Sequence, residues 1–378
     1  MDVPKLYVSP ELREFSDKKS LDKRLSAVDD ATLVRPPASC HEVLLGADGR
    51  TLEGGYRYTV NAFDTVARTL APGLCALVPN LAGENHRARR KKEQQAFPEA
   101  VSVFNAVTRA RFESELAQCQ FVFNEADKII EGVLGPKTKY LDNSLFFQLV
   151  DETLVATFGN EVSFYCAHVA GRRFLLRYHK NDSLCSIQSG DESHHIHRGY
   201  HFSNSESGDA SVRAAPMYIN PETGHACLGR FAKAKTRMIH AGREFRARLN
   251  SLLSAAMVAG GDDEAVGVEL QSLSARPLNL RMPSHEDFDD GLTKLASVCA
   301  KYGTITNSFA QSIVHHAVYT GAFPSGDSQY RALRDSQIVQ RNEYDVYCAV
   351  IAEASKLPIR QRESAEQAAF DYLLDGNR

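Results

Sequence analysis

The segment Gly190–Asn220 reads GDESHHIHRGYHFSNSESGDASVRAAPMYIN, and the fold prediction starts from it. It places four histidines, several small polar side chains and two arginines among residues that favour β-strands. Tyr200–Ser205 and Ser211–Ile219 predict two strands of a hairpin that turns at Ser207-Gly208. His225–Leu228 predicts a short strand after it.

The residues before this segment predict more strands of the same sheet. Val162–Val169 and Arg173–His179 are β-rich runs on either side of Ala170-Gly-Arg172, which favours a hairpin turn. Leu184–Gln188 extends the meander. Five or more strands joined by short turns predict a strongly twisted antiparallel sheet.

The residues after the segment predict one long helix, from Phe231 to Val258. Met238, Phe245 and Leu249 recur at helical spacing and form an apolar stripe. Gly260-Gly261 ends the pattern, as glycine does at many helix ends. The sequence therefore predicts an α+β fold, a twisted antiparallel sheet backed by a long helix.

Three regions follow from these patterns: an N-terminal arm (1–40), an α+β core domain (41–261) and a helical C-terminal region (262–378). Within the core, Asp142 or Asn143 is the expected cap of a helix that runs to Phe158. Residues 262–282 look like a linker, and after residue 283 we expect helices alone, with an all-helical C-terminal region.

Composition restricts the class of protein. The 378 residues have a net charge of −3, so nucleic-acid binding would have to depend on local basic patches. Eight scattered cysteines with no C-x-x-C pair indicate free thiols in a reducing compartment. No leader pattern and no membrane-length apolar run occurs. We therefore expect a cytoplasmic protein without membrane contact.

Two basic segments are the candidate nucleic-acid contacts. His86–Lys92 reads HRARRKK, which is either a solvated surface or a phosphate-binding arm that uses Arg89, Arg90 and Lys91. The predicted long helix carries Lys233, Arg237 and Arg248 opposite its apolar stripe, and this face is either solvated or functional.

The predicted sheet supplies the remaining parts of a binding groove. Arg213 and the polar residues Ser203–Asp209 are either a hairpin tip with its turn chemistry or a phosphate-contacting edge. Four aromatic residues stand near them and would offer stacking surfaces for bases: Tyr178, Tyr200, Phe202 and Tyr218. Stacking combined with phosphate pairing is typical of sequence-tolerant single-strand binding.

Signs of an enzyme are few. The phosphate-loop, dinucleotide, nucleophile-elbow and zinc-protease motifs are all missing. His197, His201 and His225 with Cys227 have the residue types of a metal site, but their spacing fits no zinc signature. Structural or surface histidines explain them as well, so we expect no metal and no cofactor.

The order of several short motifs resembles a known family. These motifs are Tyr58-Thr-Val60, Lys139-Tyr-Leu-Asp-Asn143, the hairpin from Phe202 to Arg213, and Tyr344-Asp-Val-Tyr347 followed by Arg360-Gln-Arg362. Together they resemble the phage- and plasmid-borne family called "domain of unknown function 932", over most of the chain. The basic run 86–92 and the histidines at 194–197 lie outside that family's pattern.

The resemblance implies a setting in mobile genetic elements, hence DNA metabolism, counter-defence or host takeover. It transfers no catalytic residues. The leading hypothesis is a phage- or plasmid-encoded protein that binds single-stranded nucleic acid in recombination, annealing or replication, as a homo-oligomer. One alternative is a factor that binds a host or phage protein, such as a defence inhibitor or virion component. Another is a metal-dependent enzyme that uses His197, His201 and His225.

Overall fold

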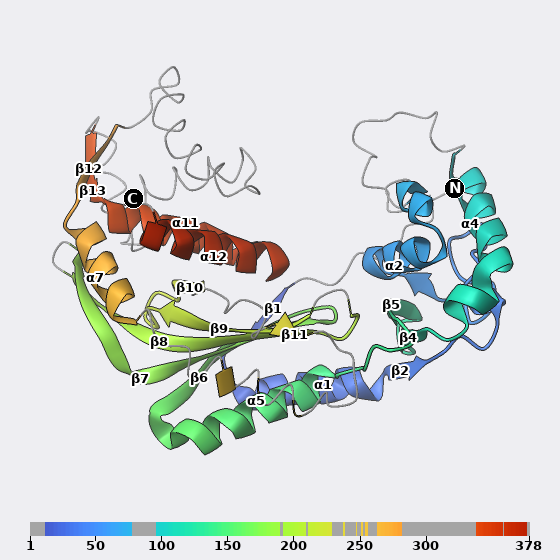
Figure 1. Ribbon diagram of the computed structural model, residues 1–378, viewed down its shortest axis with the longest axis horizontal. Helices are drawn as coiled ribbons and strands as arrows, with labels where there is room; N and C mark the ends of the chain where they lie inside the picture. Colours follow the sequence, from blue (N-terminus) through green and yellow to red (C-terminus); the bar gives the residue numbers. More distant parts are fainter. Residues whose placement is uncertain are drawn as a thin grey trace.

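The computed structural model contains three β-sheets, one large, one small and one of two strands, and seven α-helices in the part of the chain that it describes (Figure 1). That part comprises residues 12–77, 96–189, 192–208, 211–228, 237–238, 247, 251, 254–255, 263–281, 338–357 and 359–375. The predicted α+β class is therefore confirmed. Within these residues, no helix has both the length and the apolar character needed to cross a membrane.

The large sheet is antiparallel, with strands in the order β1-β6-β7-β8-β9-β10 and with β11 also paired to β9. Its strands are β1 (Arg13–Phe15), β6 (Val162–Ala170), β7 (Arg173–Ser189), β8 (Glu192–Ser205), β9 (Val212–Ile219), β10 (Ala226–Leu228) and β11 (Arg237–Met238). The predicted hairpins are confirmed, and β7 and β8 run further than their β-rich cores because they pair with each other.

Alternation along the central strands separates two faces of this sheet. Phe174 and Leu176 of β7 and Phe202 of β8 face an apolar core. That core is closed by α1 (Lys18–Asp30) and α5 (Asn143–Phe158), which lie along one face (Figure 1). Neighbouring residues on these strands alternate between the two faces. Arg177 of β7 and His201 of β8 therefore lie on the opposite face of the sheet.

The helix α5 begins where the sequence predicts it. The side chain of Asp142 accepts a hydrogen bond from the Leu145 backbone N–H at 2.5 Å, which satisfies one of the free amides of the first turn. The buried side chains Phe146 and Val150 are spaced one turn apart and face the sheet. The predicted cap and helix are confirmed.

The small sheet is mixed, with strands in the order β2-β4-β5-β3, and its core lies under α2 and α4. Its elements are β2 (Thr32–Arg35), β3 (Arg57–Tyr58), β4 (Gln120–Asn124), β5 (Ile129–Leu134), α2 (Val60–Leu70) and α4 (Ala96–Arg111). Short helical turns occur at Cys40–Glu42, Pro72–Leu77, Phe112–Leu116 and Gly159–Glu161.

The two sheets meet through β5 and the turn between β8 and β9. A Cβ at Gly132 would lie 2.5 Å from the Cα of Ser207, so only glycine permits this approach. The buried guanidinium of Arg172 pairs with Glu131 on β5 and with Glu206 in the turn. The small sheet is thus joined to the large sheet by backbone packing and by a shared ion pair.

The C-terminal elements cover the other face and one end of the large sheet (Figure 1). They are α7 (Asp263–Ser274), β12 (Pro277–Arg281), β13 (Ile338–Asn342), α11 (Glu343–Ser355) and α12 (Ile359–Asp375). The last two confirm predicted helices. The strand pair β12–β13 shows that the region after residue 262 is not all-helical, and α7 replaces the expected linker because its apolar residues pack on the sheet.

The prediction of one long helix over residues 231–258 is also wrong. Arg237 and Met238 form β11 and pair with Arg213 and Val212 of β9, so the chain is extended at that point. Pairing with β9 outweighed the helical spacing of the apolar residues, because hydrogen bonds within a sheet can satisfy the same backbone groups as those within a helix.

The expected N-terminal arm contributes to both sheets over its described residues. β1 pairs with β6, and β2 pairs with β4. The boundaries at residues 40 and 261 stay predictions.

Candidate functional site

The face of the large sheet under α12 carries an unusual set of polar side chains. They come from the central strands and from the first half of α12, and we call them the buried charge network: Cys166, His168, Arg177, His201, Ser203, Arg213, Arg362, Glu363 and Glu366. Glu363 and Glu366 stand one helical turn apart, so both carboxylates point to the sheet.

Glu366 is the centre of one half of the network. Its two oxygens pair with Arg177 and with Arg362, whose Nε lies 2.8 Å from Oε1. Glu366 and Arg177 are 0% exposed, so each charge depends on the other for compensation. Two further Arg177 nitrogens, Nε and Nη1, find no hydrogen-bond acceptor among the described residues.

Glu363 is the centre of the other half. It accepts hydrogen bonds from His201 Nε2 at 2.8 Å, Ser203 Oγ at 2.6 Å and Arg213 Nη1 at 3.0 Å. Burial alone would raise the pKa of Glu363, but these donors lower it overall. Burial lowers the pKa of His201, and the hydrogen bond and charge of Glu363 oppose that shift.

Cys166, His168 and Glu14 resemble a nucleophile, base and orienting acid. Cys166 Sγ lies 3.4 Å from His168 Nε2, and Glu14 Oε2 lies 3.8 Å from His168 Nδ1. Burial raises the pKa of the Cys166 thiol to about 12 and lowers the pKa of His168 to about 2. The thiol therefore stays protonated and buried, which is the environment of a structural cysteine.

The same three residues are the one metal-type cluster in the described part of the chain. Arg362 Nη1 lies 3.1 Å from His168 Nε2 and donates to the lone pair that a metal ion would need on that side. Burial and the charges of Arg362 and Arg177 disfavour a positive charge on the imidazole, and they would act on a cation in the same way. The residues present do not fit a metal ion.

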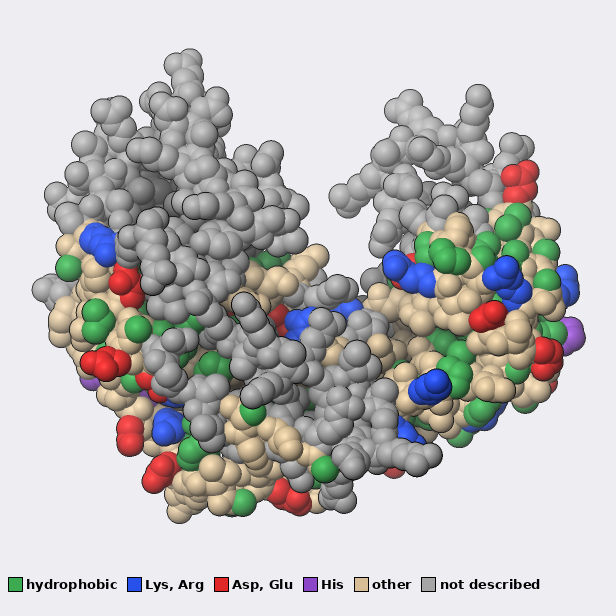
Figure 2. Space-filling view, in the orientation of Figure 1, with side chains coloured by type: hydrophobic (Ala, Val, Ile, Leu, Met, Phe, Trp, Pro, Cys, Tyr) green, Lys and Arg blue, Asp and Glu red, His purple; other side chains and the backbone are tan. Residues whose placement is uncertain are grey.

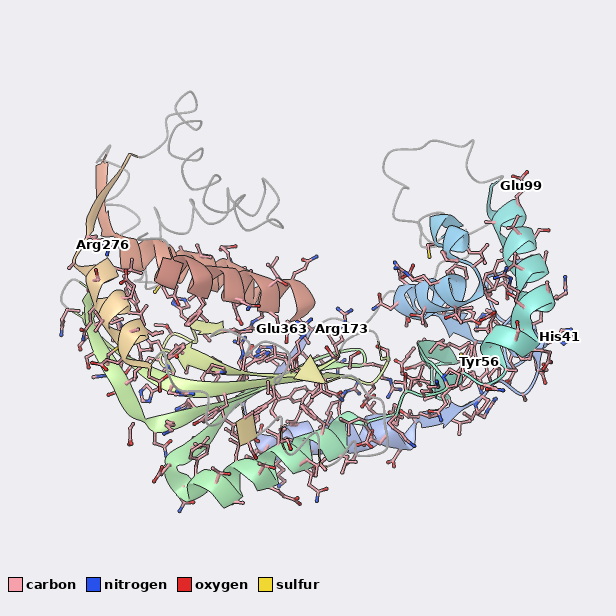
Figure 3. All side chains as sticks on the ribbon, in the orientation of Figure 1. His41, Tyr56, Glu99, Arg173, Arg276 and Glu363 are labelled. Carbon is pink, nitrogen blue, oxygen red and sulfur yellow. The ribbon has the colours of Figure 1, made fainter. Side chains whose placement is uncertain are left out.

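A small pocket opens beside the network at the first turn of α12. Its volume is about 20 Å³. We call it the arginine pocket, and it is lined by Arg173, Ser203, Asn204, Ser211, Arg213, Ile359 and Glu363. Arg173 and Glu363 lie near each other in the middle of the molecule (Figure 3). Lysine and arginine side chains also appear at the base of the hollow between the two ends of the molecule (Figure 2).

The arginine pocket is lined by charged side chains of both signs. They are the guanidinium groups of Arg173 and Arg213 and the carboxylate of Glu363, and neither guanidinium is without a partner. The pocket also lies at the N-terminal turn of the 17-residue helix α12, where backbone amides and the helix dipole attract negative charge.

Two of the predicted binding residues are neighbours in the sheet. Arg213 on β9 and Arg237 on β11 are directly paired in register, although 24 positions separate them in sequence. The guanidinium of Arg213 is partly buried and pairs with Glu363. The side chain of Arg237 and the residues Arg89, Arg90, Lys91, Lys233 and Arg248 lie outside what the structure describes.

The predicted stacking groove is wrong. Tyr178, Tyr200, Phe202 and Tyr218 are each at most 3% exposed. The first three pack in the core under α1 and α5, while Tyr218 stacks on Phe370 of α12. Rings on strands between two helical layers fill the core, so they offer no open face to a base.

The predicted histidine metal set does not gather among the described residues. His201 hydrogen-bonds Glu363, whereas His197 Nδ1 contacts the Lys180 carbonyl at 2.9 Å. Sequence reasoning missed Arg173, Arg177, Glu363 and Glu366. One sequence pattern could have indicated the two glutamates. Glu363 and Glu366 stand at helical spacing on the same side of a helix as the apolar Ala369 and Phe370, which are buried.

The fold and the network together define an α+β protein whose sheet–helix interface is charged and buried, with a small arginine-lined pocket at its edge. No protein-family model, curated protein or solved structure matches this chain. The resemblance drawn from its short motifs therefore stays a hypothesis.

Proposed function

We propose that this protein binds a single nucleic-acid strand through its phosphates, without strong sequence preference, at the end of the large sheet that carries the arginine pocket. The register of Arg213 with Arg237 is the observation that carries the proposal, because it brings together two cationic positions predicted from separate segments. Arg173 adds a third on the same pocket.

Phosphate contacts suffice for sequence-tolerant binding, because the backbone is the same for every base. The buried rings remove base stacking from the proposal. What is left is electrostatic attraction by guanidinium groups, which predicts an affinity that falls steeply as salt rises.

A role in annealing, recombination or replication within a phage or plasmid, as a homo-oligomer, is the wider form of this proposal. It draws on the motif resemblance and, by analogy of fold, on the use of sheet-and-helix architectures by annealing proteins. A protein-binding role is the alternative, and the net charge of −3 is compatible with it.

Fluorescence anisotropy with a labelled single strand of mixed sequence tests the proposal. We expect binding at about 50 mM salt that weakens by orders of magnitude by about 200 mM. Arg173→Gln should weaken binding and reduce the slope of log affinity against log salt by about one. Arg109→Gln, which removes an equal charge from the exposed side of α4, is the matched control.

Two results would end the proposal. One is an absence of binding at low salt, and the other is an affinity that ignores salt concentration. If only a protein from host lysate treated with nuclease is retained on the purified chain, the protein-binding alternative takes its place.

A further inference from the structure

An open pocket of about 500 Å³ lies where the chain passes between the large and the small sheet. The chain passes twice, from α1 to β2 through residue 31 and from β5 to α5 through residues 135–142 (Figure 1). We call this space the junction pocket, and its lining comes from the end of α1, from β2, from the segment before α5 and from the first turns of α5. Its volume is in the range of small-molecule sites, which often lie between domains.

The polar side chains of the junction pocket offer hydrogen-bond acceptors. The hydroxyl of Ser144 is hydrogen-bonded to the Asp29 carboxylate, and the hydroxyl of Thr32 donates to the Val28 carbonyl at 2.5 Å. These two hydroxyl hydrogens are already used, so oxygen lone pairs remain. The pocket therefore suits a ligand that brings its own N–H or O–H donors.

Two carboxylates, of Asp29 and Asp142, give the pocket its charge. Oδ1 of Asp142 accepts the backbone N–H of Leu145 at 2.5 Å, but a carboxylate has about four acceptor sites, so most of its capacity is left. Burial, then the charge of Asp142, raise the pKa of Asp29 from 3.8 to about 6. The two carboxylates thus repel each other, and a positive group beside them would remove the repulsion.

Two positive features lie near these carboxylates, and neither cancels their charge. The N-terminus of α5 is equivalent to about +0.5 of an elementary charge, whereas Asp142 alone brings a full negative charge. Arg172 lowers the pKa of Asp29 through its charge, but it is already shared by Glu131 and Glu206. The field in the pocket is therefore negative and favours a cation.

The walls of the pocket favour an organic cation over a metal ion. Val34 and Leu145 add apolar surface, which an alkyl chain can cover and a metal ion cannot use. Within the described residues, no third acidic, histidine or cysteine side chain joins Asp29 and Asp142 in a metal-type cluster. Tyr140 also lines the pocket, and its shielded Oη has no hydrogen-bond partner in the described part of the chain. An N–H donor from a ligand would satisfy it.

We propose that the junction pocket binds a protonated primary amine on an aliphatic chain. Asp29 and Asp142 hold the ammonium group, and the chain lies against Val34 and Leu145. A free diamine and the lysine side chain of a partner protein share this chemistry, and the experiment separates these two sources. The proposal is independent of nucleic-acid binding.

Isothermal titration calorimetry on the full chain tests it with two probes, 1,4-diaminobutane and Nα-acetyl-lysine methylamide. We expect saturable binding of one amine per chain. Tighter binding of the diamine indicates a free amine as the ligand, and tighter binding of the lysine probe indicates a partner's side chain. The neutral analogue 1,4-butanediol should not bind, because it lacks the positive charge.

Variants connect binding to the pocket. Asp29→Asn and Asp142→Asn each remove one charge, and asparagine caps a helix as well as aspartate does, so α5 keeps its cap. Each variant should weaken amine binding by about tenfold or more. Asp22→Asn removes an equal charge from an exposed position of α1 and should leave the affinity unchanged. Thermal melts check that each variant is folded.

Acid gives a second readout. The amine stays charged while Asp29 takes up a proton near pH 6, so binding should be about tenfold weaker at pH 5.0 than at pH 7.5. Asp29→Asn should remove most of this difference.

Three results would overturn the amine site. They are an absence of saturable binding by both probes at pH 7.5, equal binding of 1,4-butanediol and the diamine, and unchanged affinity in both asparagine variants. Each leaves the strand-binding proposal in place, because salt-dependent anisotropy tests that proposal separately.

Discussion

Glu366 shows how one buried residue can hold two cations. Its carboxylate is the shared partner of Arg177 on β7 and Arg362 on α12, and all three side chains are at most 5% exposed. A buried pair of this kind adds little stability over an apolar substitute, but breaking it leaves charge without compensation.

Glu366→Ala should therefore lower the free energy of unfolding by about 3–5 kcal/mol, because two guanidinium groups lose their shared anion. Denaturant titration followed by circular dichroism measures it. Asp64→Ala is the control, since Asp64 pairs with Arg68 on the solvated side of α2 and should cost at most about 1 kcal/mol. Equal losses for the two variants would contradict the account.

His168 gives the fold a defined response to acid. Burial, then the charges of Arg362 and Arg177, lower its pKa from 6.5 to about 2. The unfolded chain thus binds a proton between about pH 6.5 and pH 2 that the folded chain does not. The contribution of His168 to stability is level above about pH 6.5 and falls as pH drops through this window.

At pH 5.0, His168 alone should cost roughly 2 kcal/mol relative to pH 7.5. His168→Gln keeps an acceptor for Arg362 but does not titrate, so its unfolding free energy should fall less over the same range. Urea unfolding at both pH values measures the difference. Some acid sensitivity should persist, because burial lowers the pKa of His201 as well. Identical pH slopes in the two proteins would exclude this role for His168.

At the scale of elements, the contact between β5 and the β8–β9 turn depends on one missing side chain. The backbone of Ser207 occupies the space where a Cβ on residue 132 would stand. Neighbouring turn geometry reinforces this, since Gly208 has a φ of +71°, which is unfavourable for other residues.

Gly132→Ala should destabilise the protein by about 1–3 kcal/mol, because backbone atoms on both sides cannot move aside as a flexible side chain can. Gly73→Ala is the matched control, since a Cβ there meets nothing within 4 Å. Thermal unfolding compares them. A melting temperature for Gly132→Ala equal to that of the control would contradict this account, because it would mean that the β8–β9 turn moves aside without a cost in stability.

For the whole molecule, Arg172 joins the two sheets. It lies in the β6–β7 turn and pairs with Glu131 of the small sheet and with Glu206, whose Oε2 lies 2.7 Å from Nη1. Glu206 also accepts the backbone N–H of Asn143 at 2.6 Å, which ties the start of α5 to the same junction.

Arg172→Met should loosen the small sheet against the large one, because the buried carboxylate of Glu206 and the largely buried carboxylate of Glu131 lose their counter-charge, at a cost of about 3–5 kcal/mol. Hydrogen exchange measured by mass spectrometry should show faster exchange over 129–134 and 205–208 than over the central strands. Arg57→Met, on an exposed position of β3, is the control. Uniform acceleration over the whole chain would instead indicate global destabilisation.

Local sequence patterns predicted the elements whose structure is determined by their own residues. The hairpins of the large sheet have period-two alternation and glycine turns, and α5 has an aspartate cap before an apolar stripe. These patterns failed where contact with another element determined the secondary structure. Arg237 is extended because β9 is beside it, and Val266 and Leu270 are helical and buried because the sheet receives them.

The sequence alone determined an α+β chain with an antiparallel sheet built around residues 162–219, since alternation and turn chemistry act between near neighbours. Tertiary structure decided the site. Arg173, Arg213, Glu363 and Ile359 lie up to 190 positions apart, and packing of α12 on the sheet puts them around one pocket. It also buried the tyrosines and the charge network, because burial depends on what covers a strand, and that information is not contained in the strand itself.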